Sequence, residues 1–444
     1  MQRSGFIATL AAVLLAGCAG QEAGQESLAP GEDFGSLPGL RAVADAWLRR
    51  ELARIEEEQG TPTQLSSRTV PAERNVAAGL AKLFPKGRIS SLLAESERLL
   101  PEDEFRFGPT ALEKAAEFRR RYDRERLAAR AALKRPERDF GIRFTDGFAA
   151  RLDFIGPVRL LARLEAFCAA EALSQNDPEA AAESLGVMLR LAECLGQEKH
   201  IEPRLEAALL RAEAFRVLQA LVLDRHAARA DLERLRQIVV AHLKRWPDDA
   251  RAWKGERALG LWAYEVVRTG RALELLTPKE IDQFREEGIL EEFPAAAVRN
   301  VDQDERYYLE TMRTLIEACA RPYHARTDTF QALRADLHKK RSSPEFPLVA
   351  GRLLLPDVWK AQRMQARDRA NWEAWAVALA AATGAEPLPF DTCPLTGSAY
   401  QVHKVDHELF VTGFGTGEEG DFPEIRVPLP QDDTSDGAGG ERPG

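Results

Sequence analysis

The stretch VRLLARLEAFCAAEALSQNDPEAAAESLGVMLRLAECLG, residues 158–196, holds two apolar helical patterns separated by a short polar connection. The stripe of the first pattern consists of Leu160, Leu161, Leu164, Phe167 and Cys168. Apolar residues recurring at this spacing lie on one face of a helix and must be covered by a neighbouring element. The stretch therefore predicts a helix over 158–173 and a second helix over 181–195 that returns antiparallel to it.

The connection also carries the signals that start and end helices. Asp177 can accept hydrogen bonds from the first backbone N–H groups of the second helix. Pro178 suits the first helical position, where an N–H group would have no partner inside the helix. Gly196 follows the last apolar residue of the pattern. Together these residues predict a helical hairpin.

The same period of about 3.6 residues continues along most of the chain. Further helices are predicted over residues 40–59, 91–100, 110–134, 203–223, 231–245, 249–267, 302–319, 327–340 and 359–382. Thr277 and Glu280 form a capping-box pattern. We expect a mainly α fold of antiparallel helical hairpins over residues 40–388, strongest at 157–268, arranged as a repeat array or as an irregular helical bundle.

The hairpin region resembles the tetratricopeptide class of helical repeats in its run from Asn176 to Ala181, followed by Leu185, Leu189, Leu191 and Ala192. That class stacks helix pairs into a superhelix whose concave side binds peptides or proteins. The chain departs from the class because the Trp-x-x-Leu-Gly-x-x-Tyr signature and a strict 34-residue period are both absent. The resemblance implies a TPR-like architecture and protein binding.

The pattern changes at residue 389. Residues 398–404 and 408–413 alternate apolar and polar side chains, which predicts a small C-terminal β-hairpin. A glycine-rich acidic loop follows and completes a segment over 389–430. The final residues, 431–444, are polar and glycine-rich, and we expect them to be a disordered tail.

This C-terminal order resembles the last element of type II secretion major pseudopilins. It is also similar to the end of planctomycete proteins of unknown function, which carry leucine-rich helical hairpins upstream. In pseudopilins the acidic loop can hold calcium, a hard cation that prefers several oxygen ligands. By this resemblance Glu418, Glu419 and Asp421 are calcium candidates, and a flexible acidic turn is the alternative.

The first residues of the chain indicate its location. Arg3 precedes a short apolar run, and Leu15, Ala16 and Gly17 stand directly before Cys18. This pattern resembles the lipobox of bacterial lipoproteins, in which the cysteine thiol is acylated and the leader is removed. The resemblance implies a signal peptide over 1–17 and a membrane anchor at Cys18, with the body in the periplasm or at the cell surface. The apolar run is too short to span a bilayer as a helix, since about 20 residues are needed.

Composition sets further limits on the body. Residues 18–39 carry acids but no Lys or Arg, and we expect them to be a flexible tether. The chain has 444 residues and a formal net charge of −9, which becomes one unit more negative when Arg3 is removed with the leader. This charge argues against nucleic acid as a partner. The cysteines after Cys18 are too few for a disulfide scaffold.

Three other groups of residues have both a structural and a functional interpretation. The charged helix predicted over 110–134 is either an ion-paired face or a basic docking strip. Trp372 and Trp375 share a helical face and are either core residues or an exposed aromatic platform. Cys393, His403 and His407 could converge on a metal, or they could be ordinary turn and surface residues.

Two classes of function remain open. The first is a membrane-anchored lipoprotein that acts as a non-enzymatic interaction or scaffold component of the bacterial envelope, with a protein partner there. The second is an envelope enzyme, hydrolase-like, whose site is assembled from residues scattered among the helices. No catalytic residue can be named, because the chain contains no nucleophile-elbow motif and no persuasive carboxylate pair. We therefore expect no cofactor besides the calcium considered above.

Overall fold

The structure is a computed structural model that describes residues 45–66, 70–80, 82–102, 105–223, 228–343, 346–415 and 424–429. Its residues form helices and one small antiparallel sheet, as the sequence predicts. Among these residues, no helix combines the length and the apolar character that crossing a bilayer requires.

The helices follow one another along the chain, with connections that vary in length. The N-terminal helices are α3 (Ala46–Glu57), α4 (Pro62–Ser66), α5 (Val76–Leu80), α6 (Ile89–Glu97), α7 (Pro109–Arg121) and α8 (Asp123–Ala132). The central helices are α9 (Ile155–Ser174), α10 (Pro178–Gly196), α11 (Ile201–Leu223), α12 (Arg229–Lys244) and α13 (Asp249–Arg268). The last helices are α14 (Pro278–Glu286), α15 (Phe293–Arg299), α16 (Val301–Ala318), α17 (Tyr323–Lys340) and α18 (Val358–Thr383). Short 3₁₀ turns lie at η2 (Lys86–Arg88), η3 (Phe144–Ala149) and η4 (Ala272–Leu275), and a π-helical turn lies at η5 (Ala350–Leu354).

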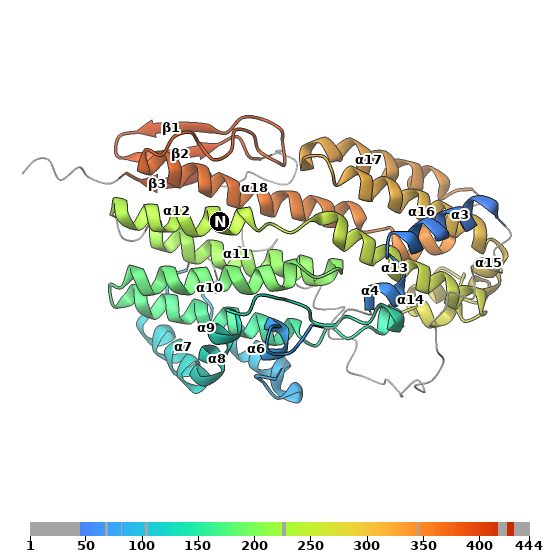
Figure 1. The fold of residues 1–444 in the computed structure, drawn as a ribbon, viewed down its shortest axis with the longest axis horizontal. Coiled ribbons are helices and arrows are strands. Elements are labelled where there is room, and N and C mark those ends of the chain that lie inside the picture. The colour runs from blue at the N-terminus through green and yellow to red at the C-terminus, as the bar shows by residue number, and fades with distance from the viewer. Residues whose placement is uncertain are drawn as a thin grey trace, which may run out of the picture.

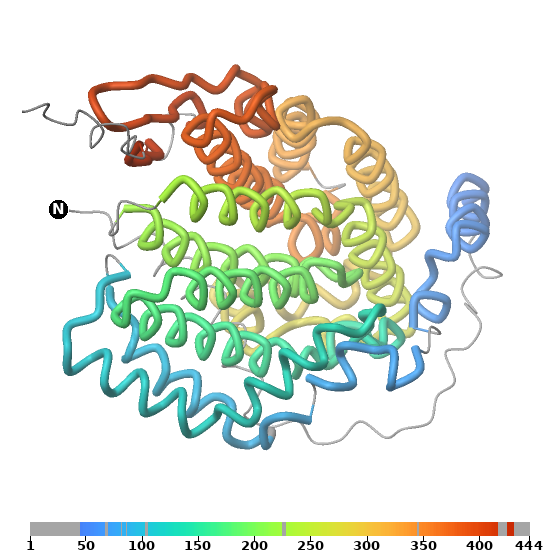
Figure 2. The backbone as a smooth tube through the Cα atoms, turned by 60° about the vertical axis from the view of Figure 1, so that its left-hand side comes forward, coloured from blue at the N-terminus to red at the C-terminus, as the bar shows by residue number. Residues whose placement is uncertain are grey.

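The long helices are arranged in layers. In the view of Figure 1, α9, α10, α11 and α12 follow one another upward, with α7 and α8 below α9 and with α18 above α12. The helix α10 packs against α9, α11 and α12, and α18 packs against both α11 and α12. The sheet covers α18 at the top, while α3, α16 and α17 lie together at the right-hand end. Figure 2 shows the same succession of layers from a second direction. The body is thus built from paired helices that pack side by side.

The predicted hairpin of residues 158–196 is present as α9 and α10. The Asp177 carboxylate accepts a hydrogen bond from the Ala180 N–H at 2.9 Å and caps α10, and Pro178 occupies its first turn. Asn176 adopts a left-handed conformation with φ of 63° in the connection, a backbone region that Asn tolerates better than most residues. The local signals in the sequence therefore set both the position and the tightness of this turn.

Two features depart from a simple sequential array. The long helix predicted over 110–134 is interrupted at Tyr122, whose φ of −120° separates α7 from α8. The break lets the Tyr122 ring pack against Phe84 and Phe118, at ring-centroid distances of 6.0 and 5.2 Å. In addition, α12 packs mainly against α18, more than a hundred residues further along the chain. Repeats of a regular solenoid contact only their neighbours, so this pairing is a feature of an irregular bundle.

The C-terminal sheet has three strands in the order β1 (Gln401–Val405), β2 (Glu408–Thr412) and β3 (Ile425–Pro428), all antiparallel. The predicted hairpin is formed by β1 and β2, and β3 extends it beyond that prediction. The inward side chains of β2 and β3 are fully or almost fully buried: Leu409, Val411, Ile425 and Val427. They belong to the same apolar cluster as Trp372 and Trp375 of α18, so the sheet shares a core with the helices.

Candidate functional site

Several of the predicted site residues lie outside the described residues. These are the lipobox residues Leu15, Ala16, Gly17 and Cys18 and the calcium candidates Glu418, Glu419 and Asp421. The tether and the C-terminal tail also lie outside them. Lipidation and calcium binding therefore stay predictions.

The possible convergence of Cys393, His403 and His407 on a metal is wrong. Cys393 is fully buried, whereas His403 lies exposed on β1 and His407 lies exposed in the turn that follows it. Within the described ranges, no group of three His, Cys, Asp or Glu side chains is placed to hold a metal ion. Strand alternation puts His403 on the solvent side of the sheet, and His407 is exposed in the β1–β2 turn, so both histidines lie apart from the buried thiol.

Trp372 and Trp375 are core residues. Each side chain is 1% exposed, and both rings make edge contacts with Phe215 of α11, at centroid distances of 6.3 and 5.8 Å. The alternative of an exposed aromatic platform is wrong because α11 and the sheet cover this face of α18.

The arginines of α7 and α8 bind mainly to acids on other helices. Arg130 binds the Glu165 carboxylate of α9 through Nε at 2.8 Å and Nη2 at 2.5 Å, and Arg119 binds Glu171 of α9 at 2.6 Å. Glu165 is 1% exposed. The arginine-rich segment is thus partly an internal ion-paired layer, while Arg120 and Arg124 remain on the surface.

A second buried polar group, which the sequence did not reveal, joins α10 to α12. His242 Nδ1 lies 3.1 Å from Glu193 Oε1, and Arg245 Nε donates to the same oxygen at 2.9 Å. Burial lowers the pKa of His242 to about 4, although the Glu193 carboxylate opposes this effect. The imidazole is therefore neutral at pH 7, and the group acts as a structural link between two helices.

A third buried group joins three helices. Asp249 of α13 receives hydrogen bonds from Arg204 of α11 and from Arg326 of α17, the latter at 2.5 Å. All three side chains are less than 9% exposed. Since a buried charge is tolerated only when it is paired, this group ties the central layers to the C-terminal ones.

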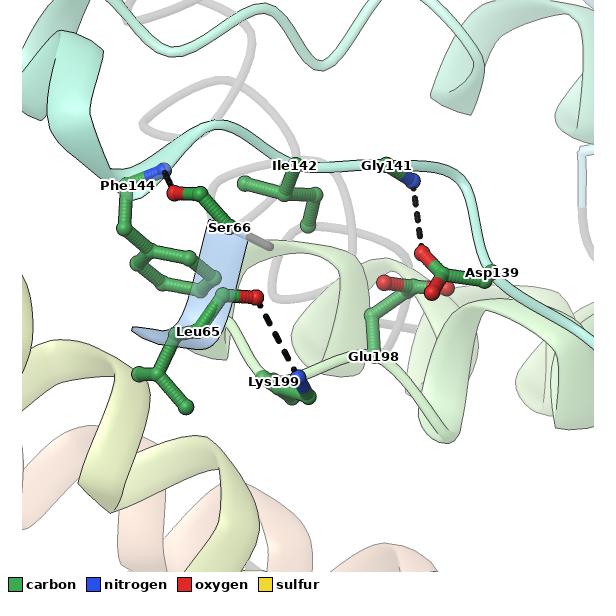
Figure 3. Close-up of a pocket in the computed structure, with 8 residues that line it drawn as sticks. All are labelled: Leu65, Ser66, Asp139, Gly141, Ile142, Phe144, Glu198 and Lys199. Atoms are coloured by element: carbon green, nitrogen blue, oxygen red, sulfur yellow. Dashed lines mark hydrogen bonds between the residues drawn. The ribbon is translucent and has the colours of Figure 1, made fainter. Parts of the chain in front are cut away.

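A small pocket lies where the segment after α8 passes the link between α10 and α11 (Figure 3). Its lining residues are Leu65, Ser66, Asp139, Gly141, Ile142, Phe144, Glu198 and Lys199. Its volume is about 10 Å³, enough for a single water molecule. The pocket is therefore too small to hold a substrate.

Glu198 is the most unusual side chain in this pocket. Burial raises the pKa of its carboxyl to about 7, and the Asp139 carboxylate, drawn beside it in Figure 3, acts in the same direction. The Phe140 N–H donates to Glu198 at 3.2 Å and partly opposes this rise. Lys199 turns away and donates to the Leu65 carbonyl at 3.3 Å. These hydrogen bonds connect the α10–α11 link to the segment after α8 and to α4.

A larger cleft of about 220 Å³ opens between the start of α16 and the end of α17. Its α16 side is formed by Asn300, Gln303, Asp304, Arg306, Tyr307 and Glu310, and its other side by Lys340, Ser343, Phe346 and Pro347. In Figure 1 these two helices lie next to each other and close to α3. Of the pocket beside Glu198 and this cleft, only the cleft is large enough for a small molecule. It is therefore the better candidate for a binding site among the described residues.

Asp304 is a buried residue in the lining of the cleft. Its Oδ1 accepts hydrogen bonds from the Tyr264 hydroxyl at 2.6 Å and the Ala350 N–H at 2.9 Å, and its Oδ2 accepts one from the Val349 N–H at 2.8 Å. Burial raises the pKa of this carboxyl, and the hydrogen bonds oppose the rise. Because both oxygens are engaged, Asp304 holds the start of η5 in place.

No family model, curated protein or solved structure matches the chain.

Proposed function

We propose that the chain is a lipoprotein of the bacterial envelope, anchored by acyl groups on Cys18, whose helical body is a non-enzymatic scaffold for another envelope protein. The lipobox pattern of Leu15, Ala16 and Gly17 before Cys18 supports the anchor. One acyl chain binds a bilayer marginally and two or more bind it stably, so a multiply acylated cysteine would suffice without a spanning helix.

The observation that carries the scaffold proposal is how the body uses its buried charges. Glu165 connects α8 to α9, Glu193 connects α10 to α12, and Asp249 connects α11, α13 and α17. These groups fix helices to one another in separate layers and do not gather around one cavity. A framework of this kind presents a constant outer surface, which lowers the entropic cost of binding a protein partner.

An enzymatic role is the second candidate, and one residue favours it. Asp304 is a carboxyl with a raised pKa that borders the cleft between α16 and α17. Tyr264 and two backbone N–H groups already donate hydrogen bonds to its oxygens, so proton transfer by Asp304 would require at least one of these bonds to break. An enzyme of this type would lose activity on Asp304→Asn, and circular dichroism would show whether the loss of one acceptor oxygen also disturbs η5.

Site-specific photo-crosslinking in native membranes tests the scaffold proposal. A photoreactive residue is placed in turn at Leu127 on α8, Arg285 on α14 and Gln331 on α17, all of which are exposed. A specific partner gives a discrete adduct at some of these positions and not at others, and the adduct disappears in the Cys18→Ala variant. Adducts at every position, or at none, would contradict a defined docking face.

A further inference from the structure

The geometry points to a ligand for the cleft between α16 and α17: we propose that it binds an uncharged sugar unit. This inference concerns the residues of the cleft alone and holds whether or not the body serves as a scaffold.

The charges around the cleft are already balanced. Arg306 lies 3.0 Å from Glu310 and 3.6 Å from Asp45 at the start of α3. Lys340 donates to Asp336 at 2.8 Å, and the Tyr307 hydroxyl donates to the same carboxylate at 3.0 Å. A ligand with a net charge would have to compete with these pairs, so the cleft favours a neutral ligand.

The remaining polar groups suit hydroxyl groups. Asn300 and Gln303 are exposed and line the cleft. Each amide carries one acceptor oxygen and an NH₂ group with two donor hydrogens. A sugar hydroxyl both donates and accepts, so it can bind such an amide at either end.

The lining after α17 includes apolar residues that are held in place. These are Phe346 and Pro347, and the Phe346 ring packs so closely on η5 that a methyl group at Gly351 would lie 2.3 Å from the ring. The Asp304 hydrogen bonds to Val349 and Ala350 fix the same segment. A sugar ring carries both hydroxyl groups and apolar C–H groups, which matches a cleft lined by amide side chains and by an aromatic ring.

Size gives the last constraint. The cleft of about 220 Å³ is smaller than the cavities of roughly 300–1,000 Å³ that enclose drug-sized ligands. It therefore suits one hexose ring, with the rest of a glycan extending into solvent.

Isothermal titration calorimetry on the full mature chain tests this proposal with cellobiose and N,N′-diacetylchitobiose as neutral probes. Glucose 6-phosphate and glucosamine serve as charged probes. We expect saturable binding of at least one neutral probe with a Kd of about 1 mM, and weaker binding of both charged probes. The double variant Asn300→Ala/Gln303→Ala should weaken that binding about tenfold, because two hydrogen bonds are removed.

Gln331→Ala is the matched control, since it truncates an exposed amide on α17 outside the cleft and should leave the affinity unchanged. Circular dichroism confirms that each variant is folded. Phe346→Ala provides a second, independent loss of binding from the apolar part of the lining. The proposal is overturned if neither neutral probe binds below about 20 mM, if a charged probe binds more tightly, or if the double variant binds as well as the unmodified chain.

Discussion

Arg130 on α8 and Glu165 on α9 form a two-point ion pair inside the protein, with N–O distances of 2.8 and 2.5 Å. Arg126 adds a third contact to the same carboxylate at 3.4 Å. Glu165 is almost fully buried, and its removal leaves Arg130 with only the exposed Glu183 and Arg126 with only Asp123 as carboxylate partners.

Glu165→Ala should therefore lower the free energy of unfolding by about 3–5 kcal/mol. The control is Asp282→Ala, which removes the exposed partner of Arg285 on α14 and should cost about 0–1 kcal/mol. Urea unfolding followed by circular dichroism measures both values. Equal effects of the two substitutions would show that the buried pair does not hold α8 against α9.

The shared core of the sheet and α18 leads to a second prediction. Leu409→Ala should shift the unfolding midpoint of the helical signal, because a buried leucine truncated to alanine costs about 2–5 kcal/mol. Val405→Ala on the same sheet is the control, since Val405 is 55% exposed and should change stability by less than about 0.5 kcal/mol. If the unfolding midpoint of the helical signal were unchanged in Leu409→Ala, the sheet would be an independent folding unit.

The features that the sequence predicts correctly are those with local causes. The cap of α10 by Asp177 and the capping box of Thr277 and Glu280 depend on residues three apart, and both are present. The β1–β2 hairpin likewise follows from alternation over a few residues. Helix and hairpin patterns can be recognised because their periods are set by the backbone alone.

The features that the sequence does not predict depend on distant partners. Arg130 and Glu165 are 35 residues apart, and no periodicity marks them as a pair. The cleft needs α16 and the residues after α17 to meet, and the break at Tyr122 depends on packing against Phe84. The predicted metal site of Cys393, His403 and His407 was wrong because Cys393 is buried and the two histidines are exposed. Burial depends on tertiary packing, which a pattern of a few residues does not reveal.

Two glycines should respond to alanine in opposite directions. A Cβ at Gly255 on α13 would lie 1.5 Å from the Lys199 carbonyl oxygen, so Gly255→Ala should destabilise the fold by about 1–3 kcal/mol. A Cβ at Gly186 on α10 meets no atom within 4 Å, so Gly186→Ala should stabilise it by about 0.5–1 kcal/mol through helix propensity. Thermal unfolding of the two variants checks the sign, and a stabilising Gly255→Ala would contradict the close approach of α13 to the α10–α11 link.

The raised pKa of Glu198 predicts a pH dependence of stability. Its pKa is about 7 in the folded protein and about 4.5 when unfolded, so between these values the folded state binds more protons. This contribution to stability is complete below pH 4.5 and is lost as the pH rises through 7. Relative to Glu198→Gln, which cannot titrate, the unmodified protein should lose on the order of 2 kcal/mol between pH 4.5 and 8.

Thermal unfolding of the two proteins across that range supplies the comparison. Other titrating groups, such as Glu305, are present in both proteins and cancel in the difference. A difference in stability that stays constant with pH would show that the Glu198 carboxyl titrates in the folded protein as it does in the unfolded one.

Mass spectrometry of the N-terminus of protein purified from bacterial membranes tests the central claim most directly. We predict that the mature chain begins at Cys18 and carries the mass of acyl chains on that residue. An unmodified cysteine at the N-terminus, or a chain that still contains Arg3 and the residues after it, would contradict lipid anchoring and with it the proposed place of this protein in the envelope.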